Sequence, residues 1–130
     1  MIAKVGSGSF IWPVPNYKYV SRWMGNGHRG ADICAAYGTP ILASDSGTII
    51  AAGWHYSYGN YVEIDHGNGY KTLYAHMSSF VVQAGQTVEK GQVVGALGEE
   101  LTMDFKLGSR SVNPRLLFQT SGGLFWKENG

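Results

Sequence analysis

The chain has 130 residues, which is the size of one domain, and 44% of them are hydrophobic, enough to bury a core. The net charge is +1 and only 15% of residues are charged, so no basic stripe supports binding to nucleic acid. Apolar runs stay well short of the roughly 18 residues that span a membrane, and residues 1–12 lack the apolar centre of a secretory signal peptide. We therefore expect either a fragment of a longer protein or a chain released by another route.

The single cysteine, Cys34, lies in a short apolar run, and one cysteine allows no intrachain disulfide. The fold must therefore be held by its core. We interpret Cys34 as a small buried hydrophobic residue rather than as a nucleophile.

Glycine separates short runs that are rich in Val, Ile, Tyr and Thr, with 19 glycines spread along the chain. This pattern is typical of many short strands joined by tight turns, and no segment has a sustained helical period. The sequence predicts one all-β domain over residues 1–130, least regular at 16–27 and 108–130. The expected strands are Ile41–Ala43, Gly47–Gly53, Asn60–Asp65, Lys71–His76, Thr87–Val88, Val93–Leu97 and Leu101–Leu107.

Two places in this pattern are more specific. The Asn68-Gly69 pair between alternating segments predicts a hairpin. In residues 101–107, apolar and polar residues alternate strictly, so one face of this strand should be buried and the other should look into a cleft or solvent.

The chemistry centres on the histidines, which stand at positions 28, 55, 66 and 76. His28 and Asp32 are separated by three residues, on a turn that leads into a strand. An imidazole nitrogen and a carboxylate oxygen at this spacing can converge on one zinc ion. By itself, this spacing is weak evidence for a metal site.

A series of motifs across about residues 10–98 gives the His28–Asp32 pair a context. They are Phe10-x-Trp-Pro-Val-Pro, Gly27-His-Arg-Gly-Ala-Asp-Ile, Gly38-Thr-Pro-Ile-x-Ala, Ser46-Gly-Thr-Ile, Gly59-Asn-Tyr-Val-Glu-Ile-Asp-His-Gly, Gly69-Tyr-x-Thr-x-Tyr-Ala-His-Met and Ala84-Gly-Gln-x-Val-x-x-Gly-Gln-x-x-Gly. In order and spacing they resemble the M23-type zinc peptidases of peptidoglycan, the lysostaphin and LytM-like family. The resemblance implies an antiparallel β-sheet sandwich or barrel with a groove, related to duplicated hybrid-motif hairpins.

The resemblance also implies roles for single residues. His28 and Asp32 match the first two zinc ligands, and His76 matches a cleft histidine that helps to activate the zinc-bound water or to stabilise the oxyanion. His66 is expected to be structural, and His55 has no counterpart and is expected in an exposed loop. The aromatic residues expected to line the substrate groove are Trp54, Tyr56, Tyr58 and Tyr74.

The pattern breaks at the family's C-terminal His-Leu-His-Phe-Glu motif, because no histidine follows His76. Two registers are open, with either residues 115–119 or residues 100–104 in place of the motif. We prefer the second register, because it keeps apolar residues on the buried face. It also places Val112-Asn113-Pro114 on the Val-Asn-Pro that often closes these domains.

Either register removes the third zinc ligand, which the second histidine of the motif provides in the family. Its position holds Thr102 in the preferred register and Leu117 in the other, and neither side chain binds zinc well. We therefore expect zinc binding to be weak or absent. Alternatively, Glu100 or Asp104 supplies the third ligand, since both should share the cleft side of the strand with Thr102, and Glu100 is then a further catalytic candidate.

Two functions follow from these expectations. The first is a catalytically impaired binding or structural module, associated with peptidoglycan or the cell envelope or with a phage particle, that recognises a peptidoglycan peptide or docks a protein partner. The second is an active zinc endopeptidase that cleaves peptidoglycan cross-bridges or stem peptides with a non-standard third ligand. Residues 85–95 also resemble a biotinyl or lipoyl carrier hairpin, but the exposed lysine that a carrier modifies has no counterpart. Both main functions predict an extracellular, envelope or virion location.

Overall fold

The computed structural model describes residue 6 and residues 10–22, 31–107 and 110–112. These residues form nine strands and, within the described ranges, no helix, so none there is long and apolar enough to cross a membrane. The strands are β1 (Tyr19–Arg22), β2 (Ala31–Cys34), β3 (Pro40–Leu42), β4 (Gly47–His55), β5 (Gly59–Asp65), β6 (Tyr70–Phe80), β7 (Thr87–Val88), β8 (Val93–Leu107) and β9 (Arg110–Val112). The expected all-β class is confirmed.

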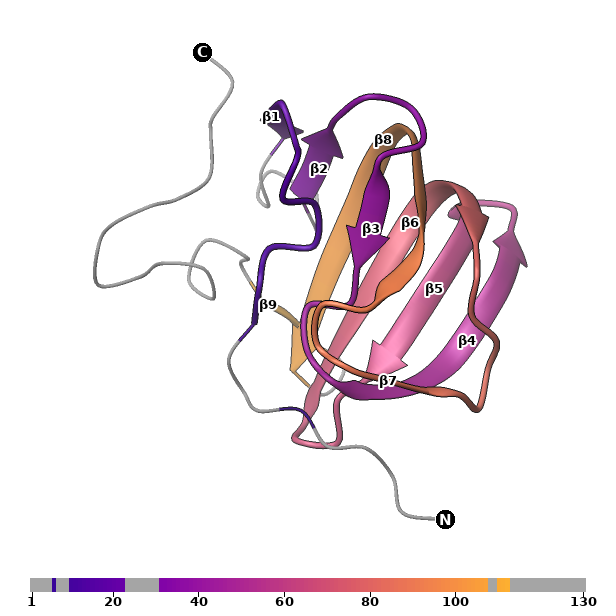
Figure 1. The fold of residues 1–130 in the computed structure, drawn as a ribbon. Helices are drawn as coiled ribbons and strands as arrows, with labels where there is room; N and C mark the ends of the chain where they lie inside the picture. The colour runs from indigo at the N-terminus through magenta and orange to yellow at the C-terminus, as the bar shows by residue number, and fades with distance from the viewer. Residues whose placement is uncertain (1–5, 7–9, 23–30, 108–109, 113–130) are drawn as a thin grey trace, which may run out of the picture.

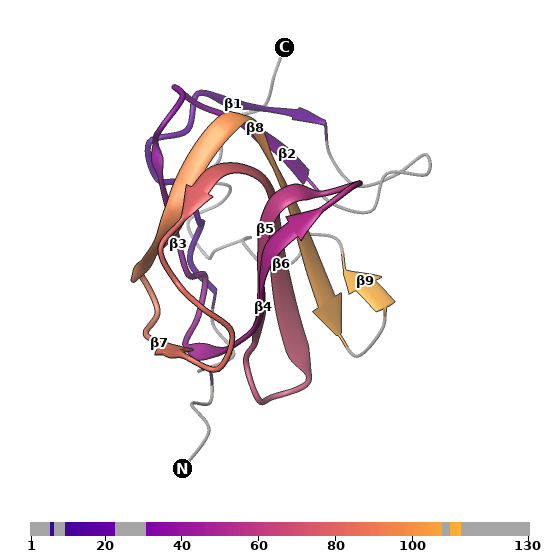
Figure 2. The same cartoon turned by 90° about the vertical axis from the view of Figure 1, so that its right-hand side faces the viewer.

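All nine strands belong to one antiparallel sheet with the order β1-β2-β8-β6-β5-β4-β7 (Figure 1). The long strand β8 organises it. Its first part pairs with β3, its second part pairs with β2 and β9, and β6 runs along its other side. Seen from the side, β8 arches over, and β3 lies across from the strands β4 to β6 (Figure 2). The apolar side chains between these layers form the core.

The core is built mainly from β-branched and other aliphatic residues at alternate strand positions. Phe10 and Trp12 from the segment before β1 pack onto it. Its fully buried members include Val14, Ile33, Ile41, Ile49, Val62, Ile64, Tyr74, Leu97, Leu101 and Met103.

The predicted strands are all present, with two differences. The segments 93–97 and 101–107, which we expected as separate strands, are one continuous strand, β8. The strands β1 and β9 were not expected from the sequence, whereas β2 is the strand into which the turn at His28 and Asp32 was expected to lead. The hairpin at Asn68-Gly69 is confirmed: it joins β5 to β6, with a positive φ at Gly67 and Gly69.

The alternation in the second part of β8 sets up two different faces. Leu101 and Met103 are buried in the core, as the sequence predicts. Thr102 and Asp104 therefore lie on the opposite side of the sheet. We call this side, which also carries Asp32 on β2, the site face.

Candidate functional site

Three adjacent strands place Asp32, Thr102 and Ala75 side by side on the site face. Asp32 on β2 pairs with Thr102 on β8, and Thr102 pairs with Ala75 on β6. The Thr102 hydroxyl donates a hydrogen bond to Oδ1 of Asp32 at 2.8 Å. The carboxylate expected to bind zinc thus accepts a hydrogen bond from the residue that stands in the expected third-ligand position in the preferred register.

The other expected ligand cannot be placed. His28 lies outside the described residues, and so do residues 115–119, the alternative site of the C-terminal motif. Within the described ranges, no three His, Cys, Asp or Glu side chains come together where they could hold a metal ion. The residues that are described therefore do not fit a complete zinc site, since a catalytic zinc has three protein ligands and a water.

Two residues further toward the start of β8, Glu100 faces Cys34 across the strand pair. The Cys34 thiol donates a hydrogen bond to Oε2 of Glu100 at 3.0 Å. On the other side of β2, Tyr19 of β1 pairs with Cys34. A hydrogen bond to Cys34 and the charge interaction with it raise the pKa of Tyr19, with further contributions from burial and from Glu100. Cys34 is half-buried and polar in its contacts, rather than the buried hydrophobic residue that we expected.

Asp104, the other candidate for a third ligand, lies two residues beyond Thr102 on the same face and is buried. Farther along, Lys106 of β8 forms an ion pair with Glu63 of β5 at 3.8 Å. The site face thus carries acidic groups near β2 and a charge pair at the far end of β8. Among its described residues, the acids Glu100 and Asp104 lie on either side of Thr102.

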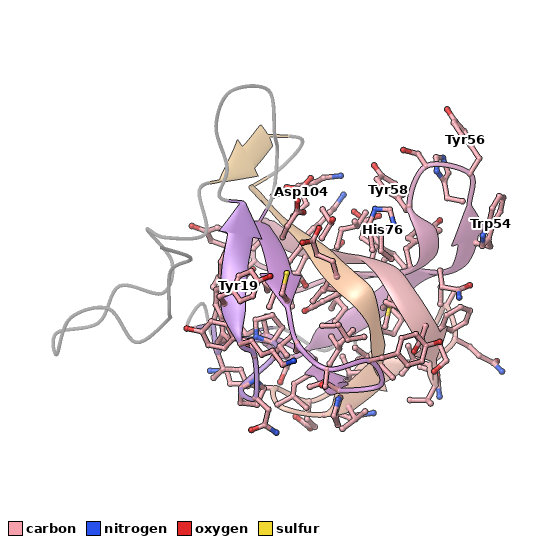
Figure 3. The ribbon with its side chains drawn as sticks, turned by 90° about the horizontal axis from the view of Figure 1, so that it is seen from above. Tyr19, Trp54, Tyr56, Tyr58, His76 and Asp104 are labelled. Atoms are coloured by element: carbon pink, nitrogen blue, oxygen red, sulfur yellow. The ribbon has the colours of Figure 1, made fainter. Side chains whose placement is uncertain are left out.

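His76 occupies a bulge in β6. Tyr74 and Met77 are both buried in the core although they are three residues apart, so the strand must accommodate one residue outside its alternation. The pairing with β8 shifts between Ala75 and Met77, and His76 takes φ 62° in the left-handed region. Its amide donates to the Tyr58 carbonyl at 2.7 Å. The exposed imidazole points to the same side as Tyr58 and Asp104 (Figure 3).

The expectation that Tyr74 lines a groove is wrong. Tyr74 is fully buried on the core side of β6, and its hydroxyl accepts hydrogen bonds from the Ser44 amide at 3.0 Å and the Thr72 hydroxyl at 2.8 Å. Burial raises the pKa of Tyr74. A side chain in this position holds the core together and cannot touch a ligand on the site face.

His66 lies inside the same polar network. Its ring is buried between the Ser46 carbonyl, 2.8 Å from Nδ1, and the Thr72 hydroxyl, 3.0 Å from Nε2. Burial lowers the pKa of His66, partly offset by the Ser46 contact. Phe10 packs edge-on against the ring. These contacts agree with the structural role expected for this histidine.

The three remaining aromatic residues of the expected groove separate into two groups. Trp54 pairs with Asn60 on the side of β4 that continues the core face, and 71% of it is exposed. Tyr56 and Tyr58 lie in the turn between β4 and β5, and Tyr58 lies beside His76 (Figure 3). Trp54 therefore does not belong with the other two, because His55, whose ring contacts both Tyr56 and Tyr58, is its neighbour on β4 and points to the opposite face.

The fold defines the class of protein. The chain resembles the catalytic domain of the antimicrobial peptidase lysostaphin from Staphylococcus simulans, with a TM-score of 0.68 and 27% identity over 79% of this chain and 92% of that one. It also resembles Helicobacter pylori Csd3, with a TM-score of 0.79 and 30% identity over 87% of this chain and 34% of that one. These likenesses confirm the lysostaphin-like β fold.

The sequence gives the family. The profile of peptidase family M23 matches residues 26–122, and the chain belongs to this family, as its motifs predict. A relative, the peptidoglycan DD-endopeptidase ShyA of Vibrio cholerae, is 42% identical over 71 residues, which are 55% of this chain and 16% of ShyA. The chain spans 16% to 22% of the length of ShyA and three other curated relatives that it matches.

Proposed function

We propose that this chain is an M23 domain of the bacterial cell envelope, or of a phage particle, that binds peptidoglycan or a protein partner without cleaving peptide bonds. The observation that carries the proposal is the hydrogen bond from Thr102 to Asp32. Its donor, Thr102, stands at the position where the preferred register expects the family's third zinc ligand.

The chemistry of zinc explains why this contact matters. A catalytic zinc lowers the pKa of its bound water to about 7 so that hydroxide attacks near neutral pH. This requires three protein ligands, and the neutral hydroxyl of Thr102 is a poor substitute for imidazole. In addition, Oδ1 of Asp32 would exchange its hydrogen bond for a metal bond. The poor third ligand and the lost hydrogen bond both weaken zinc binding. A weakly bound zinc does not activate a water molecule for attack.

The alternative third ligands are less well placed. Glu100 and Asp104 each lie two residues from Thr102, which is about 6.5–7 Å at ordinary strand rise. Oε2 of Glu100 already accepts the Cys34 hydrogen bond. A carboxylate from either residue would have to reach back along β8 to the position opposite Asp32. This distance supports the non-catalytic function over an active peptidase with a carboxylate ligand.

The binding half of the proposal rests on the family and on what the site face retains. ShyA is named a peptidoglycan DD-endopeptidase, and a domain of the same family that lost catalysis can keep its affinity for the substrate. His76 and Tyr58 remain exposed or half-exposed beside the site. Family membership and these accessible side chains together favour a peptidoglycan peptide as the ligand.

The test is incubation of the purified chain with bacterial cell-wall sacculi in the presence of added zinc. We expect the protein to sediment with the sacculi and the chromatogram of soluble muropeptides to stay unchanged. ShyA, which is named a peptidoglycan DD-endopeptidase, is the positive control for cleavage under the same conditions. Release of muropeptides that a chelator stops would overturn the proposal and direct attention to Glu100 and Asp104.

A further inference from the structure

Four rings form a row at the tip of the β4–β5 hairpin, which we call the tip row: His55, Tyr56, Tyr58 and Tyr61. The His55 ring is central, 4.5 Å from Tyr56 and nearly parallel to it, and 4.8 Å from Tyr58. Tyr61 meets His55 at 6.2 Å and Tyr58 at 5.6 Å. Each ring thus contacts at least one other ring of the row, and the row extends from β5 out to the turn.

The tip row is held in place although its outer end is open to solvent. The Ser57 amide donates to Nδ1 of His55 at 3.0 Å, which fixes the orientation of the central ring. The Tyr58 carbonyl accepts the amide of His76. Tyr56, at the end of the row, is 84% exposed. Fixing the rings beforehand reduces the entropy that a ligand must overcome on binding.

The surroundings of the row select the kind of ligand. Residues 53–62 contain no Asp, Glu, Lys or Arg, although they contain four aromatic residues and a histidine. The hairpin itself therefore supplies no charged side chain with which to recognise nucleic acid, an acidic lipid or a charged peptide. It fits a neutral ligand with flat apolar faces and a polar rim, which is the chemistry of a pyranose ring: C–H groups stack on an aromatic face, and tyrosine hydroxyls meet the sugar hydroxyls.

We propose that the tip row is a subsite for the glycan strand of peptidoglycan, an uncharged stretch of N-acetylated amino sugars. This inference rests on the proposed function, since it extends the site face rather than replacing it. His76 connects the two, because it stands next to Ala75 in the row that contains Asp32 and contacts the backbone of Tyr58. Figure 3 shows Tyr58 and His76 side by side, with Tyr56 farther out at the tip. A peptide on the site face and its glycan on the tip row would then bind together.

The probe is the tetramer of N-acetylglucosamine, which contains the sugar but no peptide. Binding is followed by calorimetry and by amide chemical shifts of the intact chain. We expect saturable binding with shifts centred on residues 55–61, and a loss of affinity of at least about tenfold in Tyr56→Ala. Tyr37→Ala is the matched control, because Tyr37 is 74% exposed in a different loop. Trp54→Ala tests the other face of the same strand. Both controls should bind like the unchanged chain.

The outcomes separate this inference from the proposed function. Absence of tetramer binding at millimolar concentration, or an equal loss in Tyr37→Ala, would overturn the glycan subsite and leave the absence of cleavage untouched. Binding of a sugar-free stem peptide that depends on Tyr56 would also overturn it, because the row would then be a peptide site. Unchanged melting temperatures of the variants show that a loss of affinity is not a loss of fold.

Discussion

Thr102 and Asp32 face each other across β8 and β2, and the threonine hydroxyl donates a 2.8 Å hydrogen bond to the carboxylate. Asp32 is buried, so its carboxylate needs hydrogen-bond donors within the protein. A side-chain hydrogen bond therefore joins the two strands at the position where the family is expected to place a metal ion.

Thr102→Val should lower the free energy of unfolding by about 1.5–3 kcal/mol, because it replaces the hydroxyl by a methyl group of similar size and leaves the Asp32 carboxylate without this donor. Urea unfolding measures the change. Thr102→Ser, which keeps the hydroxyl, is the control and should lose much less. Equal stability of the valine variant and the unchanged chain would mean that the contact does not stabilise the fold.

The double variant Glu100→His with Thr102→His restores the His-x-His pattern of the family on β8. Imidazole at position 102 would stand opposite Asp32, so the affinity for zinc should rise at least about tenfold over the unchanged chain in calorimetric titration. Glu100→His alone is the control, since it leaves Thr102 in place and should gain little. If the double variant binds zinc no better than this control, position 102 is not the third-ligand position.

The strand pattern around this site could be predicted, but the pairing could not. Strict alternation of apolar and polar residues predicted the buried face of Leu101 and Met103 and the opposite face of Thr102 and Asp104. Which strand lies next to β8 depends on contacts between residues about 70 positions apart, and no local pattern encodes them. The pairing of Thr102 with Asp32 favours the second of the two registers that the sequence left open.

Tyr74→Phe should destabilise the fold by about 1–3 kcal/mol without changing ligand binding. The phenylalanine ring fits the same space, but the Ser44 amide and the Thr72 hydroxyl lose their shared acceptor in a buried setting. Thermal unfolding and sedimentation with sacculi are the two measurements. If the variant is as stable as the unchanged chain but sediments less with sacculi, Tyr74 contributes to ligand binding and the prediction is wrong.

His66 should make the fold sensitive to mild acid. Burial lowers the pKa of His66 below its ordinary value of 6.5, so at lower pH the unfolded chain takes up a proton that the folded chain resists. Its contribution is complete above about pH 6.5 and falls as the pH drops below that value, by up to about 1.4 kcal/mol per pH unit. Unfolding free energies of the unchanged chain and His66→Gln between pH 7.5 and 5.5 measure this, and the variant should show the shallower slope. Identical slopes would contradict it.

Tyr74 and His76 show why parts of the site escaped prediction. Residues 72–75 are buried on both faces of β6, so polarity alone could not assign Tyr74 to one face. The bulge at His76 inserts one residue into the alternation of β6, so this histidine does not point into the core as its distance from Tyr74 would predict. The tip row was missed as a unit because its rings meet across a turn, and Trp54 was grouped with it only by nearness in the sequence.

The most direct test of the central claim is the zinc content of the chain purified without chelator, combined with a calorimetric zinc titration. The account predicts far less than one zinc per chain, and weak binding that a chelator removes without lowering the melting temperature. About one tightly held zinc per chain, with a melting temperature that falls when the metal is stripped, would contradict it and mean that a third ligand completes the site beside Asp32.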